Sequence, residues 1–424
     1  QGENDRRLAQ ALGRIYQGVD LVAAGRTAAA VEGSRHTPCA AADGTRSVPA
    51  TVLGVGGVSS RRVRVGFLSA YFRDHTIGRL NLGRVQHLTR DRFEVTVLYA
   101  GRREDEMTRA FARAADRFVA VPRDVAAARR QIADLGLNLL IFADVGMDAL
   151  TSTLAFSRMA PIQCVTWGHP DTTGSPAMDY FISSELLETP EADGHYSERL
   201  VRLPNLGTYY YRPSLSGPDR SRESFGLESG RHVYLCPQTL FKFHPDFDTV
   251  LDGILAQDPL ADLVLLQGRV PHWTAKLQQR LARSLGDRSS RVRFLPSQPN
   301  EAFLQLLSRA DVVLDPFPYG GGNTSYEALA VGVPIVTWPS AYLRGRITLA
   351  LYRKMGWTEC VAGSAEEYVD LALRLANDRA YRQSACTTIQ ATSPALFEDL
   401  DEVHALEVFL QGLTVPRGGL ASGA

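Results

Sequence analysis

A glycine-rich turn that leads into a helix is the strongest chemical feature of this sequence. It reads DPFPYGGGNTSYE at residues 315–327 and follows an apolar segment typical of a buried strand. The glycines let backbone N–H groups approach an anion, and the polar residues after them can cap a helix whose N-terminus carries about half a positive charge. The alternative is a plain turn with an ordinary N-cap. Five residues are candidates to bind a diphosphate and its ribose: Gly321, Gly322, Asn323, Thr324 and Glu327.

A lysine follows the first apolar strand of the C-terminal half, in the segment PQTLFKFHP at 237–245. Lys242 is expected at the carboxyl end of that strand, the edge at which open parallel sheets bind ligands. An ammonium group there can neutralise the charge that builds on a departing diphosphate. The chain has only two other lysines, Lys276 and Lys354. A solvated surface lysine is the alternative.

Two histidines follow strand-like segments of the N-terminal half. His75 lies in an Arg-Asp-His break after the first strand, and His169 lies in WGHPDTTG at 167–174, which also offers two threonine hydroxyls. The ordinary pKa of histidine, near 6.5, suits either ring to accept a proton or orient an acceptor group. Asp144, which ends another strand, could orient a histidine or cap the next helix.

Several familiar catalytic motifs are missing. No group of His, Asp and Glu has metal-ligand spacing, so we expect no metal cofactor and assign charge neutralisation to the helix N-terminus and Lys242. There is no GxSxG elbow, Walker lysine or opening GxGxxG. Hydrolase, kinase and dehydrogenase functions are therefore disfavoured.

Apolar strand segments alternate with helical segments from residue 61 onwards, the pattern of a parallel sheet covered on both faces. One series spans 61–167 and a second spans 233–338, with a Tyr/Pro-rich hinge at 204–220 between them. The prediction is an α/β chain of GT-B-like architecture, with two Rossmann-like, doubly wound domains and a cleft between them. Its expected parts are an N-terminal helix and linker at 1–60, domains at 61–215 and 216–385, and C-terminal helices and tail at 386–424. The helices at 365–377 and 398–412 are candidates to cross back onto the first domain.

Composition limits partners and compartment. The 46 basic and 46 acidic side chains balance, so no global field recruits nucleic acid or a membrane surface. The five cysteines are scattered without a CxxC pair, which argues against a disulfide framework or a zinc site. No stretch approaches the ~18–20 apolar residues of a membrane span, and no signal-peptide core is visible. We expect a cytoplasmic protein, with a helix at 4–24 and a linker at 25–60.

Spaced blocks of the sequence resemble the catalytic region of the O-linked N-acetylglucosamine transferase family, including bacterial relatives and cytoplasmic N-glucosyltransferases of adhesins. The blocks are VRVGFLSAYFRDH, APIQCVTWGHPDTTG with MDYFISS, HYSERLVRLP, LFKFHPDF and ADVVLDPFPYGGGNTSYEALAVGVPIVTWP, within residues 61–410. The resemblance implies a GT-B fold, a UDP-sugar donor, inversion at the anomeric carbon, and transfer to Ser or Thr, or Asn in one branch, without a metal.

The resemblance also assigns roles residue by residue. Lys242 matches the lysine that binds the donor phosphates, and His75 matches a first-domain histidine proposed to act near the acceptor or as base. Asn323 and Thr324 fall on the phosphate-binding pair at the helix start. Glu327 falls where an aspartate holds the ribose.

Other positions depart from the family. Phe303 falls where a histidine stacks on uracil, and an aromatic ring can still stack there. Gln298 lies in the loop whose backbone reads the uracil edge. Thr239 stands where a glutamine is expected, with Gln238 one residue earlier, and Gly322 replaces a histidine. These departures leave the expected diphosphate binding intact and leave the sugar and the acceptor class open.

The predicted function is an inverting, metal-independent transfer of GlcNAc or Glc from a UDP-sugar to a protein or peptide, with His75 the first and His169 the second choice of base. Expected partners are the UDP-sugar and a polypeptide acceptor, with no nucleic acid, no membrane span and a possible homo-oligomer. A nucleotide-sugar epimerase, a small-molecule glycosyltransferase and a catalytically silent nucleotide-sugar-binding protein remain alternatives.

Overall fold

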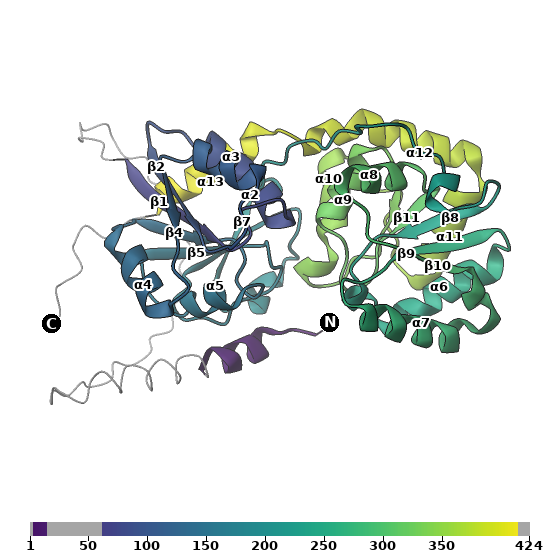
Figure 1. Cartoon of the computed structure of the whole chain (residues 1–424), viewed down its shortest axis with the longest axis horizontal. Helices are drawn as coiled ribbons and strands as arrows, with labels where there is room; N and C mark the ends of the chain where they lie inside the picture. The colour runs from purple at the N-terminus through teal and green to yellow at the C-terminus, as the bar shows by residue number, and fades with distance from the viewer. Residues whose placement is uncertain (1–2, 15–61, 414–424) are drawn as a thin grey trace.

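The computed structural model describes residues 3–14 and 62–413. It has two lobes, each built around a parallel sheet with helices on both faces (Figure 1). The predicted linker at 25–60 and the second half of the predicted 4–24 helix lie outside the described residues.

The first lobe contains a seven-stranded sheet in the order β3-β2-β1-β4-β5-β6-β7, in which every adjacent pair is parallel. The strands are β1 Val63–Ser69, β2 Phe93–Tyr99, β3 Arg117–Ala120, β4 Leu139–Phe142, β5 Ile162–Thr166, β6 Tyr180–Ser184 and β7 Arg199–Leu203. The carboxyl ends of the strands share one edge, so the loops that carry His75 and His169 meet there.

Helices cover both faces of the first sheet because its central strands are apolar on both sides. The helices are α2 Thr76–His87, α3 Glu106–Ala114, α4 Val125–Asp134 and α5 Ala149–Leu154. Phe67 packs in one core with α2 and α3, whereas its neighbour Leu68 packs in another core with α4 and α5. This alternation is the period of two that a strand imposes.

The second lobe contains a five-stranded parallel sheet in the order β10-β9-β8-β11-β12. Its strands are β8 His232–Cys236, β9 Ala261–Leu266, β10 Val292–Leu295, β11 Val312–Leu314 and β12 Ile335–Val336. Its helices are α6 Pro245–Gln257, α7 Pro271–Leu285, α8 Asn300–Ser308, α9 Asn323–Ala330, α10 Ile347–Met355, α11 Ala365–Asn377 and α12 Arg379–Thr392.

One helix returns from the second lobe to the first. This is α13, Leu400–Gly412, which lies beside α2 and α3 in Figure 1 and buries Val403, Leu406 and Leu410 in the first lobe's core. The expectation that 365–377 also crosses is wrong: α11 packs on α6, where a Cβ on Gly253 would come within 3.1 Å of Val369. The predicted boundary at 385 falls inside α12, which stays with the second lobe.

The N-terminal segment, residues 3–14, contains a helix over 6–14 that lies against the first lobe with its start near the second (Figure 1). The contact is close, because a Cβ on Gly13 would lie 2.5 Å from the carbonyl oxygen of Gly174. Among the described residues, no helix has the length and apolarity required to cross a membrane.

Candidate functional site

The glycine-rich turn joins β11 to α9 at the lobe boundary. Gly322 is the N-cap of α9 and has no side chain, so no side chain accepts from the helix's first N–H groups. The predicted capping side chains point elsewhere: Asn323 accepts from Tyr210, Thr324 accepts from Gln238, and Ser325 bonds Thr348. The first turn of α9 therefore presents backbone donors without a capping acceptor, as an anion site requires.

A buried carboxylate holds the turn in place. The Gly321 N–H donates to Asp315 Oδ1 at 2.5 Å, and Thr337 donates to Oδ2 at 2.8 Å. A Cβ on Gly321 would lie 2.5 Å from Ser325 Oγ and 2.6 Å from Gln238 Nε2, so both side chains would have to move to admit it. Burial raises the pKa of Asp315, and these hydrogen bonds oppose the rise.

Lys242 reaches the same turn from the loop after β8. Its Nζ donates to the carbonyl of Gly320 at 2.6 Å and to Gln238 Oε1 at 3.1 Å, and lies 4.4 Å from the centre of the Tyr319 ring. Burial lowers the pKa of Lys242 to about 8, against the attraction of Asp315. The structure thus brings the predicted lysine and the predicted phosphate turn together.

Glu327, the predicted ribose ligand, is 2% exposed and forms an ion pair with Arg79 of α2 in the opposite lobe. Arg79 also contacts Asp74 at 2.9 Å and the Asn300 side chain at 3.1 Å. Burial raises the pKa of Glu327, and the guanidinium of Arg79 counters that rise. A ribose that binds Glu327 must therefore share its carboxylate with Arg79.

The hinge contributes a tyrosine that the sequence reading did not assign to the site. Tyr210 is 2% exposed, stacks on Tyr326 of α9 with ring centres 4.3 Å apart, and donates to Asn323 Oδ1 at 2.6 Å. It fixes the first residue of α9 relative to the hinge.

Three predicted donor-site residues do not join the cluster. Thr239 is exposed, and only its backbone carbonyl is engaged, by the Lys242 N–H at 2.9 Å. Gln298 bonds the carbonyl of Pro296 in its own loop at 2.9 Å. Phe303 is 9% exposed and packs in the second-lobe core, so it shows no open ring face in this arrangement, and base stacking by Phe303 stays a prediction.

His75 is the N-cap of α2 and stacks on Tyr71 with ring centres 4.4 Å apart. Its Nδ1 accepts from the Ile77 N–H at 3.2 Å, so the proton of the neutral ring lies on Nε2. Burial and the nearby Arg73 lower the pKa of His75 to about 4. This geometry makes Nε2 a hydrogen-bond donor and disfavours His75 as the base.

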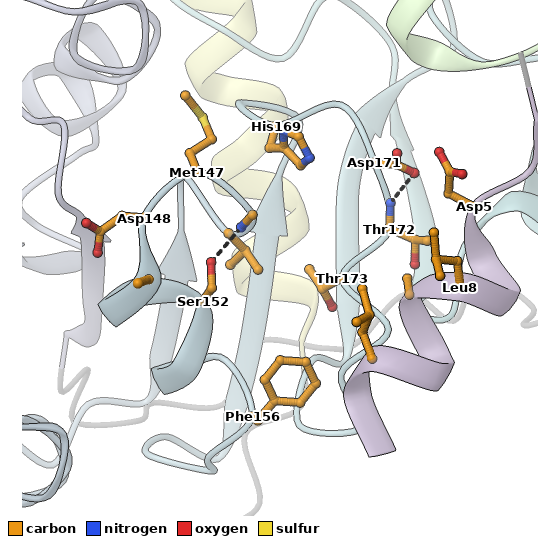
Figure 2. A pocket seen from close by; sticks show the side chains of 15 residues that line it. Asp5, Leu8, Met147, Asp148, Ser152, Phe156, His169, Asp171, Thr172 and Thr173 are labelled. Atoms are coloured by element: carbon orange, nitrogen blue, oxygen red, sulfur yellow. Dashed lines mark hydrogen bonds between the residues drawn. The ribbon is translucent and has the colours of Figure 1, made fainter. Parts of the chain in front are cut away.

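His169 lines a pocket of 520 Å³ between the N-terminal helix and the loops after β4 and β5 (Figure 2). Burial and Arg344 lower its pKa, so the ring is neutral. The two hydroxyls predicted to face the cleft are committed elsewhere, since Thr172 and Thr173 both donate to Glu198. All three residues line the pocket, and His169 is the one among them with a ring nitrogen that can take up a proton.

Asp144 orients neither histidine. It is fully buried and accepts from Ser69 Oγ at 3.0 Å and from the Ala70 N–H at 2.8 Å, which ties the end of β4 to the end of β1. Burial raises its pKa to about 7. Its role is to shape the loop that leads to His75.

No group of three or more His, Cys, Asp or Glu side chains is placed to hold a metal ion within residues 3–14 and 62–413. The positive charge at the glycine-rich turn comes from Lys242 and the start of α9.

Comparison with known proteins identifies relatives of the whole two-lobed region. The model of glycosyl transferase family 41 matches residues 55–211 and 219–400. A mutant of the O-GlcNAc transferase of Thermobaculum terrenum superposes with a TM-score of 0.74 at 28% identity, covering 83% of this chain and 67% of that one. An Anabaena HepE structure in complex with UDP and glucose superposes with a TM-score of 0.56 at 14% identity, covering 83% of this chain and all of that one, a likeness of fold alone. These matches confirm the predicted GT-B fold.

Curated relatives cover the chain in part. A probable UDP-N-acetylglucosamine–peptide N-acetylglucosaminyltransferase, SPINDLY of Hordeum vulgare, is 35% identical over 52% of this chain and 23% of its own length. A UDP-glucose:protein N-β-glucosyltransferase of Actinobacillus pleuropneumoniae is 28% identical over 58% of this chain and 39% of its own length. The aligned part of the chain thus spans less than a quarter of the first relative and well under half of the second. Because the family model accounts for most of the sequence, and the structure has the matching two-lobed fold, the chain belongs to glycosyl transferase family 41.

Proposed function

We propose that this protein transfers GlcNAc or Glc from a UDP-sugar to a polypeptide side chain, Ser or Thr or in the alternative Asn, with inversion and without a metal ion. The family supports a glycosyltransferase, and the relatives named above are described as peptide or protein glycosyltransferases. UDP lies on the second lobe, with its diphosphate at the glycine-rich turn and its ribose near Glu327.

The observation that carries the proposal is the meeting of Lys242 with the turn at the start of α9. The Lys242 ammonium lies 2.6 Å from the Gly320 carbonyl, beside a helix start that no side chain caps. Both groups stabilise negative charge, and a half-buried site makes that stabilisation stronger than in water. A leaving diphosphate gains charge in the transition state, so these groups act where the reaction needs them.

The acceptor approaches from the first lobe. Its nucleophilic oxygen or nitrogen bonds to the anomeric carbon while the bond from that carbon to the phosphate oxygen breaks, and UDP leaves with the electron pair. Attack opposite the leaving group inverts the anomeric carbon. The acceptor's proton passes to His169 or to solvent, and the Nε2–H of His75 is a donor for an oxygen of the acceptor or of the diphosphate.

Donor turnover and peptide modification test the proposal. The protein is incubated with UDP-GlcNAc, UDP-Glc or UDP-Gal and a peptide library, with and without a chelator, and modified peptides are detected by mass. Lys242→Met should reduce turnover by at least about a hundredfold, as loss of a charge-stabilising donor typically does. Lys276→Met is the matched control, because Lys276 is exposed on α7. Normal turnover in Lys242→Met would reject the role of the lysine, and an epimer without peptide modification would favour the epimerase.

A further inference from the structure

A buried arginine lies where the two lobes and the N-terminal segment meet. Arg344, in a short 3₁₀ turn of the second lobe, is 4% exposed. Its Nη1 lies 3.2 Å from a carboxylate oxygen of Asp171 in the first lobe and 3.2 Å from one of Asp5 in the N-terminal segment. The guanidinium also lies 4.9 Å from the centre of the Tyr342 ring. Two acidic side chains from separate parts of the chain thus converge on one enclosed cation.

The N-terminal segment binds there through one backbone carbonyl, one carboxylate and two polar side chains. Arg344 donates to the Glu3 carbonyl as well as pairing with Asp5. The side chains of Asn4 and Arg6 both donate to the carbonyl of Gly194, at 3.5 and 3.3 Å. Figure 2 shows Asp5 projecting from the N-terminal helix toward Asp171. The pair with Arg344 is thus the charged contact of this segment, and another acidic peptide could make the same contact.

The carboxylate site is connected to the donor site through a single glycine. The carbonyl of Arg344 accepts from the Gly320 N–H at 2.9 Å, and the carbonyl of Gly320 accepts from Lys242 at 2.6 Å. His169 and Asp171, two residues apart on one loop, both line the 520 Å³ pocket that Asp5 also lines. A peptide held at Arg344 therefore lies beside the pocket that His169 lines, and one glycine away from Lys242.

We propose that Arg344 is a docking site for an acidic side chain of the polypeptide acceptor, and that residues 3–6 of the chain occupy this site in the arrangement described here. The inference rests on the proposed function, since it names a feature of the acceptor. Asp5 stands in for the acceptor's Asp or Glu, and the Asn4 and Arg6 contacts stand in for its neighbours. An acceptor that carries an acidic residue close to the modified residue displaces the segment and gains the pair with Arg344.

A binding experiment tests the docking site without sugar transfer. The probe is a labelled synthetic peptide with the sequence of residues 1–14, compared with the same peptide carrying Asn in place of Asp5. The protein is the full chain with Asp5→Asn, which weakens its own hold on the site. We expect the acidic peptide to bind this chain about tenfold tighter than the neutral one, as a charge-assisted contact allows, and to bind wild-type chain more weakly. Equal affinity of the two peptides would overturn the proposal.

Changes at the site itself identify the cation. Arg344→Gln should abolish the preference for the acidic peptide, whereas Arg344→Lys should keep part of it. If Arg344→Gln does not fold, Asp171→Asn provides the test. Removing this competing carboxylate should increase the preference for the acidic peptide over the neutral one. An unchanged or smaller preference would contradict the proposal. UDP binding is measured in the same samples, so that the docking site and the donor site are tested separately. If the wild-type chain does not bind UDP, the proposed function is wrong. The comparison of the two peptides tests the role of Arg344.

Discussion

The ion pair between Arg79 and Glu327 can affect UDP binding in two opposite ways, and the variant Arg79→Met distinguishes them. If Arg79 merely competes with ribose for Glu327, then Arg79→Met should tighten UDP binding. If Arg79 keeps Glu327 ionised and oriented, the same change should weaken it. We expect weakening, because Glu327 is 2% exposed and burial already raises its pKa. Without the guanidinium, the carboxylate is a buried charge with little compensation.

The size of the effect follows from how the protein would relieve that charge. Protonating a carboxylate of ordinary pKa 4.5 at neutral pH costs about 3.4 kcal/mol, at about 1.36 kcal/mol per pH unit, which sets a ceiling on the penalty. A protonated Glu327 no longer accepts charge-assisted hydrogen bonds from ribose, each worth about 1.5–3 kcal/mol. We therefore expect the Kd for UDP to rise by about ten- to a hundredfold at pH 7.

Calorimetric titration of UDP over a pH series is the assay. In Arg79→Met the folded-state pKa of Glu327 is raised further, so UDP affinity should recover as pH rises through that pKa and the carboxylate ionises. Glu327→Gln should weaken binding without this pH dependence, and adding Arg79→Met to it should change little. Arg109→Met, which breaks only an exposed pair on α3, is the control. Tighter UDP binding in Arg79→Met would refute the reasoning.

Three further predictions concern charge, space and stability. The affinity of the wild-type chain for UDP should fall about tenfold per pH unit above about pH 8, because Lys242 loses its proton there. In the same titration, Lys242→Gln should show no such pH dependence of UDP affinity. Gly321→Ala should weaken UDP binding, since its Cβ would lie 2.6 Å from Gln238 Nε2 and displace the side chain that bonds Lys242. Gly322→Ala, whose nearest neighbour is 3.5 Å away, should bind nearly normally, and equal losses would show that space is not the cause. Glu402→Ala should lower the free energy of unfolding by about 3–5 kcal/mol in a urea titration, because Lys354 keeps only Asp399 as a partner and the buried N–H groups of Leu206 and Gly207 lose their acceptor. A loss under about 1 kcal/mol would contradict this.

Strands buried on both faces were predictable from sequence, because nothing but continuous apolar character is needed to recognise them. The segments that became β1, β2, β8 and β9 are of this kind. The strands β6 and β7 were not recognised: YFISS is short and partly polar, and RLVRL carries arginines that an edge strand exposes. The helix α12 was missed for a similar reason, since much of its surface is polar and only Ala385 and Ile389 are buried.

The sequence predicts those parts of the donor site that directly follow a strand. Lys242 and the glycine-rich turn each follow a strand of one parallel sheet, so they had to share an edge. Gln238 was passed over for Thr239 because the 3₁₀ turn that follows was not foreseen; it leaves Thr239 exposed, while Gln238 is 5% exposed and bonds Lys242. Arg79 could not be found from local pattern, since its partner is 248 positions away in the other lobe.

Arginines carry the polar contacts between the lobes at both ligand positions. Arg79 pairs with Glu327 where the ribose is proposed, and Arg344 pairs with Asp171 where the acceptor is proposed. A third arginine, Arg346, donates to the Leu187 carbonyl at 2.6 Å beside the second of these. Each proposed ligand position is therefore a contact between the lobes, and we expect each ligand to favour the arrangement in which its arginine is placed. Because such coupling is reciprocal for binding free energies, donor occupancy should alter peptide affinity by the same factor by which peptide alters donor affinity.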